Sequence, residues 1–206
     1  MVPGYSKTVQ NHITLSDGRR LSFAEFGDRQ GKPVFYFHGF PGSRLEAKLA
    51  DGISRESQVR FIGIERPGFG LSDFKPGRSF IDWADDVAEL ANDLRIDRFS
   101  ILGVSGGGPY AAACACKMPD RLEAVGIICG MGPVDVPELI RGMPWLYRQG
   151  LRLAGRLPGI TTVLYSFPAF FFRFYPERML SILSGKVARP DKIALKNTEL
   201  INVLSA

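Results

Sequence analysis

The stretch ILGVSGGG at residues 101–108 decides the fold that we expect of this chain. An apolar run leads into Gly-x-Ser-x-Gly, and small residues follow, which is the pattern of a strand, a sharp turn and a helix. A serine at the tip of such a turn has a strained backbone, and the residues two positions away must be small so that strand and helix can approach each other. Gly103 and Gly107 meet that requirement. Ser105 is therefore a candidate nucleophile, although glycine-rich turns with this spacing also occur without catalysis.

The sequence on either side of the serine alternates between strand and helix patterns. Residues 8–15 and 20–26 alternate apolar and polar side chains, which predicts a hairpin. Apolar runs predict further strands at 33–37, 59–64, 99–102 and 124–129, and the intervening segments predict helices near 44–57, 79–96 and 109–118. Because strands and helices alternate from residue 33 onward, we expect an α/β fold with a mostly parallel twisted sheet and helices on both faces.

Two further motifs precede the serine in the chain. They are FHGFPGS at residues 37–43 and RPGFGLSD at residues 66–73. Together with GVSGG at residues 103–107, in this order and at these separations, they resemble the N-terminal two thirds of an α/β-hydrolase. Relatives more often carry Asp where this chain has Glu65, which changes no residue expected to act in catalysis.

The resemblance implies roles for particular residues. Ser105 would be the nucleophile, and the backbone N–H groups of Phe40 and Gly106 would form the oxyanion hole. The supporting loops would include His38, Gly39, Gly103 and Gly107. A serine at this position excludes the branches that attack with a carboxylate and leaves hydrolases of esters, thioesters, lactones, amides and carbon–carbon bonds.

The general base is missing from the expected pattern. A serine hydroxyl needs a base to take its proton and a carboxylate to orient that base, and the family places them in the order serine, acid, histidine. No histidine follows Ser105. Asp135 and Glu138 are candidate acids, but both positions are also typical of a loop or of the entry to a cap. His38 precedes the serine, so we expect it to have a structural role. We therefore predict a C-terminally incomplete form of a serine hydrolase, which lacks the final strands and is inactive or incomplete as this chain.

The charge distribution predicts two regions. Residues 1–130 contain 16 basic and 16 acidic side chains, whereas residues 131–206 contain 10 basic and 5 acidic ones, so the whole net charge of +5 lies in the second region. We expect 1–130 to form the hydrolase core and 131–206 a helical cap. Arginines recur every four residues across 148–156, which predicts an amphipathic helix, and aromatic residues crowd into 165–175. Ordinary cap packing, an acyl pocket and contact with a membrane surface all remain open for this region.

Composition narrows the function classes. The three cysteines are odd in number, lack the spacing of metal ligands and lie among apolar residues, so we expect reduced core thiols, no metal and a cytoplasmic protein. The first residues lack the apolar run of a signal peptide, and no apolar stretch is long enough to span a bilayer. We expect no cofactor and no nucleic-acid partner, because the core is charge-neutral and carries no nucleic-acid-binding motif.

Two functions follow from these observations. The first is hydrolysis of a carboxylic ester or related acyl compound with an apolar portion, through an acyl-Ser105 intermediate. The second is a non-catalytic remnant of the fold that binds a small ligand or a partner chain, which the missing histidine favours. If the apolar strand at 124–129 is the edge of the sheet, self-association through that edge is expected as well.

Overall fold

A computed structural model describes residues 11–40, 42–134, 136–143 and 145–157 of the chain, together with 159–161, 163–164, 174–175 and 178. The chain falls into two compact units, Met1–Met131 and Gly132–Ala206. The first unit contains the sheet and all three sequence motifs.

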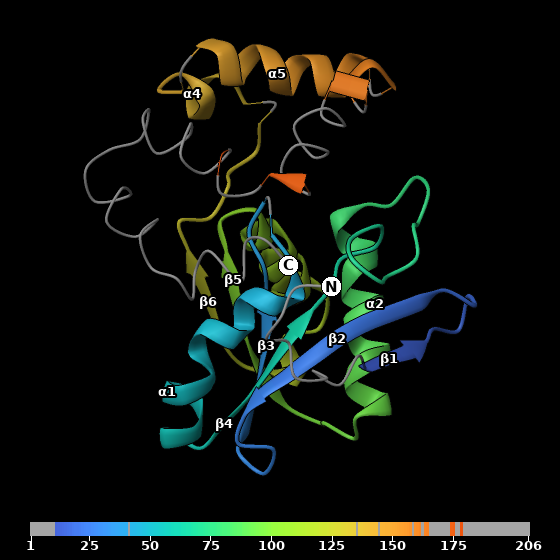
Figure 1. Cartoon of the computed structure of the whole chain (residues 1–206), viewed down its shortest axis with the longest axis vertical. Coiled ribbons are helices and arrows are strands. Elements are labelled where there is room, and N and C mark those ends of the chain that lie inside the picture. Colours follow the sequence, from blue (N-terminus) through green and yellow to red (C-terminus); the bar gives the residue numbers. More distant parts are fainter. Residues whose placement is uncertain are drawn as a thin grey trace. The chain divides into compact units, whose positions relative to one another are not determined.

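One six-stranded sheet organises the first unit (Figure 1). Its strands follow the spatial order β1-β2-β4-β3-β5-β6. They are β1 (Asn11–Thr14), β2 (Arg20–Gly27), β3 (Lys32–Phe37), β4 (Val59–Ile64), β5 (Phe99–Val104) and β6 (Leu122–Ile128). β1 and β2 form the predicted antiparallel hairpin, and β2 is also antiparallel to β4. The four strands from β3 to β6 are parallel, which confirms the predicted mostly parallel sheet.

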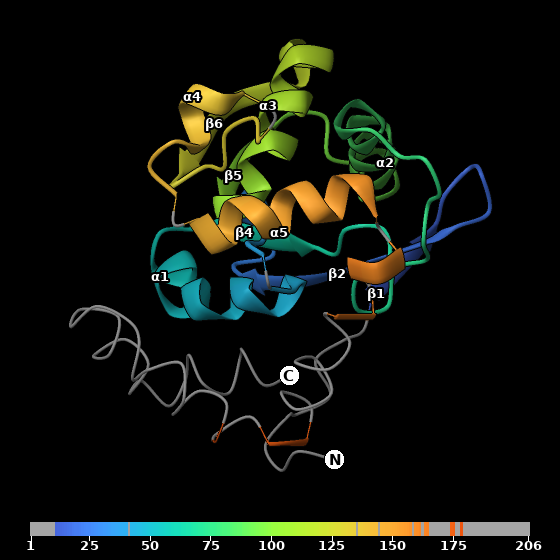
Figure 2. The ribbon, with the colours of Figure 1, turned by 90° about the horizontal axis from the view of Figure 1, so that it is seen from above.

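Helices cover both faces of this sheet, as predicted (Figure 2). On one face lie the 3-10 helix η1 (Arg44–Ala50) and α1 (Asp51–Glu56), and on the other lie α2 (Phe80–Asp93) and α3 (Gly108–Lys117). Successive strand residues point to opposite faces, so each face has its own core. The larger core includes Phe35, Phe37, Ile62, Ile64, Trp83, Val87, Leu90, Phe99 and Ile101, and the smaller one Ala24, Phe26, Tyr36, Ala47 and Phe61.

The start of α2 shows how a local signal sets an element boundary. The Ser79 side chain accepts a hydrogen bond from the Asp82 N–H, and the Asp82 carboxylate accepts one from the Ser79 N–H. This is the predicted capping box, with Asp in place of the usual Glu. The helix then buries one apolar stripe, which includes Trp83, Val87 and Leu90, against the sheet.

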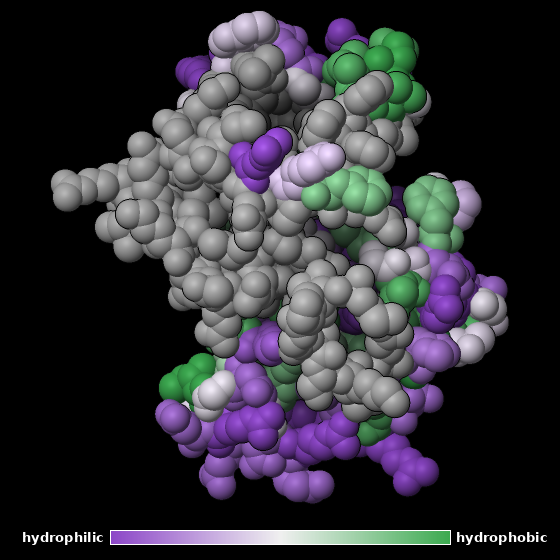
Figure 3. All heavy atoms as spheres, in the orientation of Figure 1, coloured by the Kyte–Doolittle hydropathy of each residue, from purple (hydrophilic) through white to green (hydrophobic). Residues whose placement is uncertain are grey.

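The end of the first unit at which β3 and β4 begin is a solvated surface. The turns before these strands, around residues 28–31 and 55–58, expose polar side chains. Figure 3 shows hydrophilic residues gathered at this lower end, beneath α1 and β4. The three sequence motifs lie at the opposite end, where β3, β4 and β5 finish.

Two of the three cysteines depart from the prediction that all are core residues. Cys114 of α3 is buried, and desolvation raises the pKa of its thiol to about 12. Cys116 and Cys129 are exposed, because Cys116 lies on the outer face of α3 and Cys129 follows β6. β6 is the edge strand among the described residues, and Ile127 and Ile128 are each about half exposed.

The second unit contains the helices α4 (Pro137–Ile140) and α5 (Trp145–Arg156). The span of α5 matches the predicted amphipathic helix, and Arg152 and Arg156 are exposed. Most of the aromatic cluster at 165–175 lies outside the described residues, as does Asp135. None of the helices in the described ranges is both long and apolar enough to cross a bilayer.

Candidate active site

Ser105 lies directly after β5, at the first residue of the short 3-10 turn η2 (Ser105–Gly107) that leads into α3. Its φ is +50°, a left-handed conformation that costs a non-glycine residue about 1–3 kcal/mol. The Ser105 carbonyl accepts a hydrogen bond from the Met131 N–H at 3.0 Å. Its hydroxyl has no hydrogen-bond partner among the described residues.

Two glycines let the strand and the helix approach each other at this turn. A Cβ atom on Gly107 would lie 2.1 Å from the Phe37 carbonyl oxygen of the adjacent strand β3. A Cβ atom on Gly103 would lie 2.7 Å from the Gly107 carbonyl oxygen and 2.9 Å from the Ala111 side chain. Both contacts are too short for any larger residue, which is the steric reason for glycine at these positions.

The loop after β3 brings the predicted oxyanion-hole residues to the same place as Ser105. Phe37 pairs with Gly103 across β3 and β5, so the two strands end side by side. A Cβ atom on Gly106 would lie 3.4 Å from the Phe40 nitrogen, and one on Gly39 would lie 3.7 Å from Ser105 Cβ. Within the part of the chain that the structure covers, the Phe40 N–H has no hydrogen-bond acceptor. The arrangement therefore leaves a main-chain donor beside the serine.

His38 is fully buried in this loop. Its Nδ1 atom lies 3.0 Å from the Gly39 carbonyl oxygen and 3.1 Å from Arg66 Nη2. Desolvation by burial, followed by the positive charge of Arg66, lowers the pKa of His38 to about 3, so the ring is neutral at physiological pH. The 3.7 Å approach of its Nε2 atom to Glu65 is consequently not an ion pair. No hydrogen bond joins His38 to Ser105.

Glu65 and Arg44 contact each other at the two ends of this region, just after β4 and just after the loop that follows β3. The buried Glu65 carboxylate forms an ion pair with Arg44 Nη1 and accepts a hydrogen bond from the Arg44 N–H at 3.2 Å. A Cβ atom on Gly70, where φ is +49°, would lie 2.2 Å from Glu65 Oε2. The Glu65 carboxylate thus leaves no room for a side chain at position 70.

Arg66 is the residue that the sequence prediction missed. It is 2% exposed, and it donates hydrogen bonds to the carbonyl oxygens of His38 and Gly39 at 3.0 and 2.7 Å. Its guanidinium lies over the rings of Phe69 and Tyr110, 4.8 and 5.2 Å from their centroids. A signal was available: Arg66 is the second residue after β4, and adjacent parallel strands end at the same edge of a sheet.

The candidate acids, Asp135 and Glu138, and the missing base stay predictions. Asp135 lies outside the described residues, and Glu138 is an exposed residue of α4 in the second unit. The sequence contains two histidines, and neither His12 of β1 nor His38 is hydrogen-bonded to Ser105. No group of three or more His, Cys, Asp or Glu residues is placed to hold a metal ion within the described ranges.

Comparisons with known proteins bear on the family of this chain. The family model described as the alpha/beta hydrolase fold matches residues 32–197. A non-heme chloroperoxidase of Streptomyces lividans is 31% identical over 126 residues, which is 60% of this chain and 46% of that protein. A serine hydrolase-like protein of Danio rerio is 28% identical over 123 residues, which is 57% of this chain and 37% of that protein.

The solved structures include a thermophilic esterase from Thermogutta terrifontis with a TM-score of 0.57 and 30% identity, covering 82% of this chain and 63% of that one. This chain spans less than half the length of the two curated relatives. The family model, in contrast, matches most of this chain. The protein therefore belongs to the α/β-hydrolase fold family, as its three motifs predict.

Proposed function

We propose that the protein is a serine hydrolase that acts on a carboxylic ester or related acyl compound through an acyl-Ser105 intermediate. The observation that carries the proposal is the strained Ser105, whose hydroxyl has no partner among the described residues and which lies beside the unbonded Phe40 N–H. Strain of this kind persists where the surrounding structure enforces it, and it is concentrated at functional sites.

The reaction would proceed in two steps. Ser105 Oγ attacks the acyl carbon while its proton passes to a general base, and the resulting oxyanion is held by the N–H groups of Phe40 and Gly106. The alcohol leaves with a proton, and water then hydrolyses the acyl-serine. We do not assign the base to His38, because its Nδ1 atom lies 3.0 Å from the Gly39 carbonyl oxygen and 3.1 Å from Arg66 Nη2 and the ring is not hydrogen-bonded to the serine.

The aromatic side chains near Ser105 favour a substrate with an apolar portion. Phe40 is 58% exposed and packs edge-on against Phe69, with 6.4 Å between the ring centroids. Exposed aromatic rings beside a reacting serine gain free energy by covering an alkyl or aryl group. The proposed substrate is therefore an ester with an apolar acyl or alkyl group.

A second candidate function is non-catalytic binding of a ligand or partner by the same site. It is favoured by the absence of any hydrogen bond between Ser105 and the two histidines of the sequence. The two candidates differ in whether a bond forms at Ser105 Oγ, which can be measured directly.

The test is covalent labelling with a fluorophosphonate of a form of the protein that supplies the general base. We expect this form to be labelled and its Ser105→Ala variant to remain unlabelled, because the probe reacts only with an activated serine. Ser100→Ala is the matched control, since Ser100 is a partly buried serine of β5, the strand that ends just before Ser105. Labelling that survives Ser105→Ala would contradict the assignment of the nucleophile. A folded wild-type protein that is never labelled would favour the binding function.

A further inference from the structure

Arg66 is a buried cation whose hydrogen bonds go to the main chain and an imidazole instead of a carboxylate. It is 2% exposed, and its bonds reach the carbonyl oxygens of His38 and Gly39 and the Nδ1 atom of His38. None of the ion pairs among the described residues includes it. Burying an arginine without a paired carboxylate is costly, so the position calls for an explanation beyond stability.

The bond to Gly39 has a geometric consequence for the next residue. Arg66 Nη2 donates to the Gly39 carbonyl oxygen at 2.7 Å, and that carbonyl belongs to the same peptide unit as the Phe40 N–H. In a trans peptide the C=O and the N–H point in opposite directions from a rigid plane. Holding the carbonyl toward Arg66 therefore fixes the direction of the Phe40 N–H. A flipped peptide would direct the carbonyl dipole to the place where the donor is needed.

A second hydrogen bond from Arg66 further restricts the orientation of the Gly39–Phe40 peptide. Arg66 Nη1 donates to the His38 carbonyl oxygen at 3.0 Å, so one planar guanidinium holds two consecutive carbonyls. The aromatic rings of Phe69 and Tyr110 in turn hold the guanidinium. A Cβ atom on Gly106 would lie 3.7 Å from Arg66 Nη1 and 3.4 Å from the Phe40 nitrogen. The cation therefore lies next to both predicted oxyanion donors.

We propose that Arg66 is the positioning residue of the oxyanion hole: it locks the Gly39–Phe40 peptide in the orientation that presents the Phe40 N–H to the substrate. This inference rests on the proposed function, since an oxyanion forms only if Ser105 reacts. Arg66 itself does not touch the substrate. Its effect is transmitted through the peptide plane, so it changes the rate of bond formation and leaves the binding of the neutral substrate unchanged.

The test compares fluorophosphonate labelling in three variants of the form of the protein that supplies the general base. Arg66→Gln removes the planar pair of donors, Arg66→Lys keeps the charge but not the fork, and Arg19→Gln removes a partly buried arginine whose partners are Asp17 and Asp86. Losing one oxyanion donor lowers the rate constant by about 100-fold or more. We expect a maximal labelling rate about 100-fold lower in Arg66→Gln, a smaller loss in Arg66→Lys and an unchanged rate in Arg19→Gln.

The concentration dependence separates positioning from general destabilisation. We expect the probe concentration that gives half-maximal labelling to stay unchanged in the Arg66 variants, because only the reacting state uses the Phe40 N–H. If Arg66→Gln does not fold, Arg66→Lys provides the test: its maximal labelling rate should fall while its half-maximal probe concentration stays unchanged. Labelling of both Arg66 variants at the wild-type rate, or an equal loss in Arg19→Gln, would overturn the role of Arg66 alone. A wild-type protein that is not labelled would overturn the proposed function and this inference together.

Discussion

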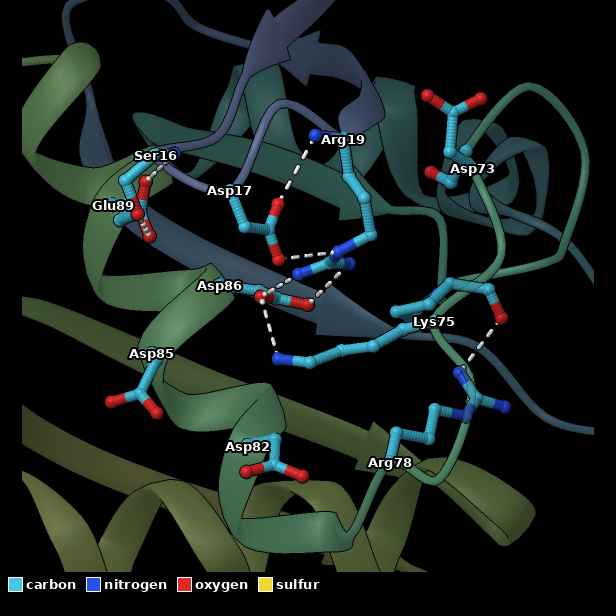
Figure 4. Close-up of polar contacts among 12 residues, drawn as sticks. Ser16, Asp17, Arg19, Asp73, Lys75, Arg78, Asp82, Asp85, Asp86 and Glu89 are labelled. Atoms are coloured by element: carbon cyan, nitrogen blue, oxygen red, sulfur yellow. Dashed lines mark hydrogen bonds and ion pairs between the residues drawn. The ribbon is translucent and has the colours of Figure 1, made fainter.

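Two arginines hold loops in this protein, the partly buried Arg19 and the buried Arg66, and their partners differ in kind. Arg19, in the turn between β1 and β2, bonds to both carboxylate oxygens of Asp86 at 2.6 and 3.2 Å and to Asp17 at 2.7 Å (Figure 4). Lys75 approaches the same Asp86 carboxylate at 3.8 Å. Arg66, at the end of β4, bonds to main-chain carbonyls and to a histidine ring.

The difference in partners indicates that Arg19 and Arg66 have different roles. In the Arg19 cluster (Asp17, Arg19, Lys75 and Asp86) each charge has an opposite charge beside it, so the cluster attaches the hairpin to α2 and has no excess charge for a ligand. In the Arg66 cluster (His38, Gly39 and Arg66) the cation holds the backbone beside Ser105, the proposed nucleophile. Stability is expected to depend more on the first cluster and reactivity more on the second.

The largest expected effect on stability comes from Asp86→Ala. Asp86 is 2% exposed, and its removal leaves Arg19 and Lys75 without their shared partner. Breaking a buried pair in this way costs about 3–5 kcal/mol of unfolding free energy, which urea denaturation measures. Asp85→Ala is the matched control, because the neighbouring Asp85 is exposed and its pair with Lys117 contributes about 0–1 kcal/mol. Equal losses in the two variants would remove the distinction between the clusters.

The second expected effect concerns how the free energy of unfolding depends on pH. His38 has its pKa lowered to about 3 by burial and by Arg66, whereas the unfolded chain binds a proton at this residue near pH 6.5. Stability contributed by the neutral ring is therefore present above pH 6.5 and is lost as the pH falls toward 3. Between pH 7 and pH 5 this loss amounts to about 2 kcal/mol. This dependence of the unfolding free energy on pH should disappear in His38→Asn, as measured by urea denaturation at each pH.

The Asp17 carboxyl should affect stability only at lower pH. Hydrogen bonds from the Arg19 side chain lower the pKa of Asp17 below its ordinary value. Its contribution is consequently present above the unfolded carboxyl pKa and is lost as the pH falls through the lowered folded value. Asp17→Asn should therefore leave the slope between pH 7 and pH 5 as it is in the wild-type protein. A slope that persists in His38→Asn and vanishes in Asp17→Asn would reverse the comparison.

The smallest effect concerns the helix that carries Asp86. Ser79→Ala removes the side-chain acceptor at the start of α2 and should cost about 1 kcal/mol of unfolding free energy. Fluorophosphonate labelling at a temperature where the protein is folded should be unchanged, because the Arg66 cluster lies on other elements. A labelling rate that fell along with stability would show that the two clusters are coupled.

Much of the fold was predictable from local patterns. The capping box of α2 involves residues three positions apart, and the turn at Ser105 is formed by residues adjacent in the chain. The exposure of Cys116 and Cys129 was not predictable from their apolar neighbours, because burial depends on what covers each face. The role of Arg66 was missed for a related reason: its partners lie 27 and 28 positions earlier in the chain.

The sequence by itself determined the strand–turn–helix around Ser105, the order of strands and helices, and the family to which the chain belongs. These features depend on side-chain periodicity and on glycines within a few positions of one another, and both are written directly in the order of residues. Only the tertiary structure decided which side chains meet at the ends of β3, β4 and β5. The parallel sheet brings Arg66 to the Gly39 carbonyl and Phe40 to Gly106. Because the Gly39–Phe40 peptide is planar, the hydrogen bond to its carbonyl also sets the direction of the Phe40 N–H group.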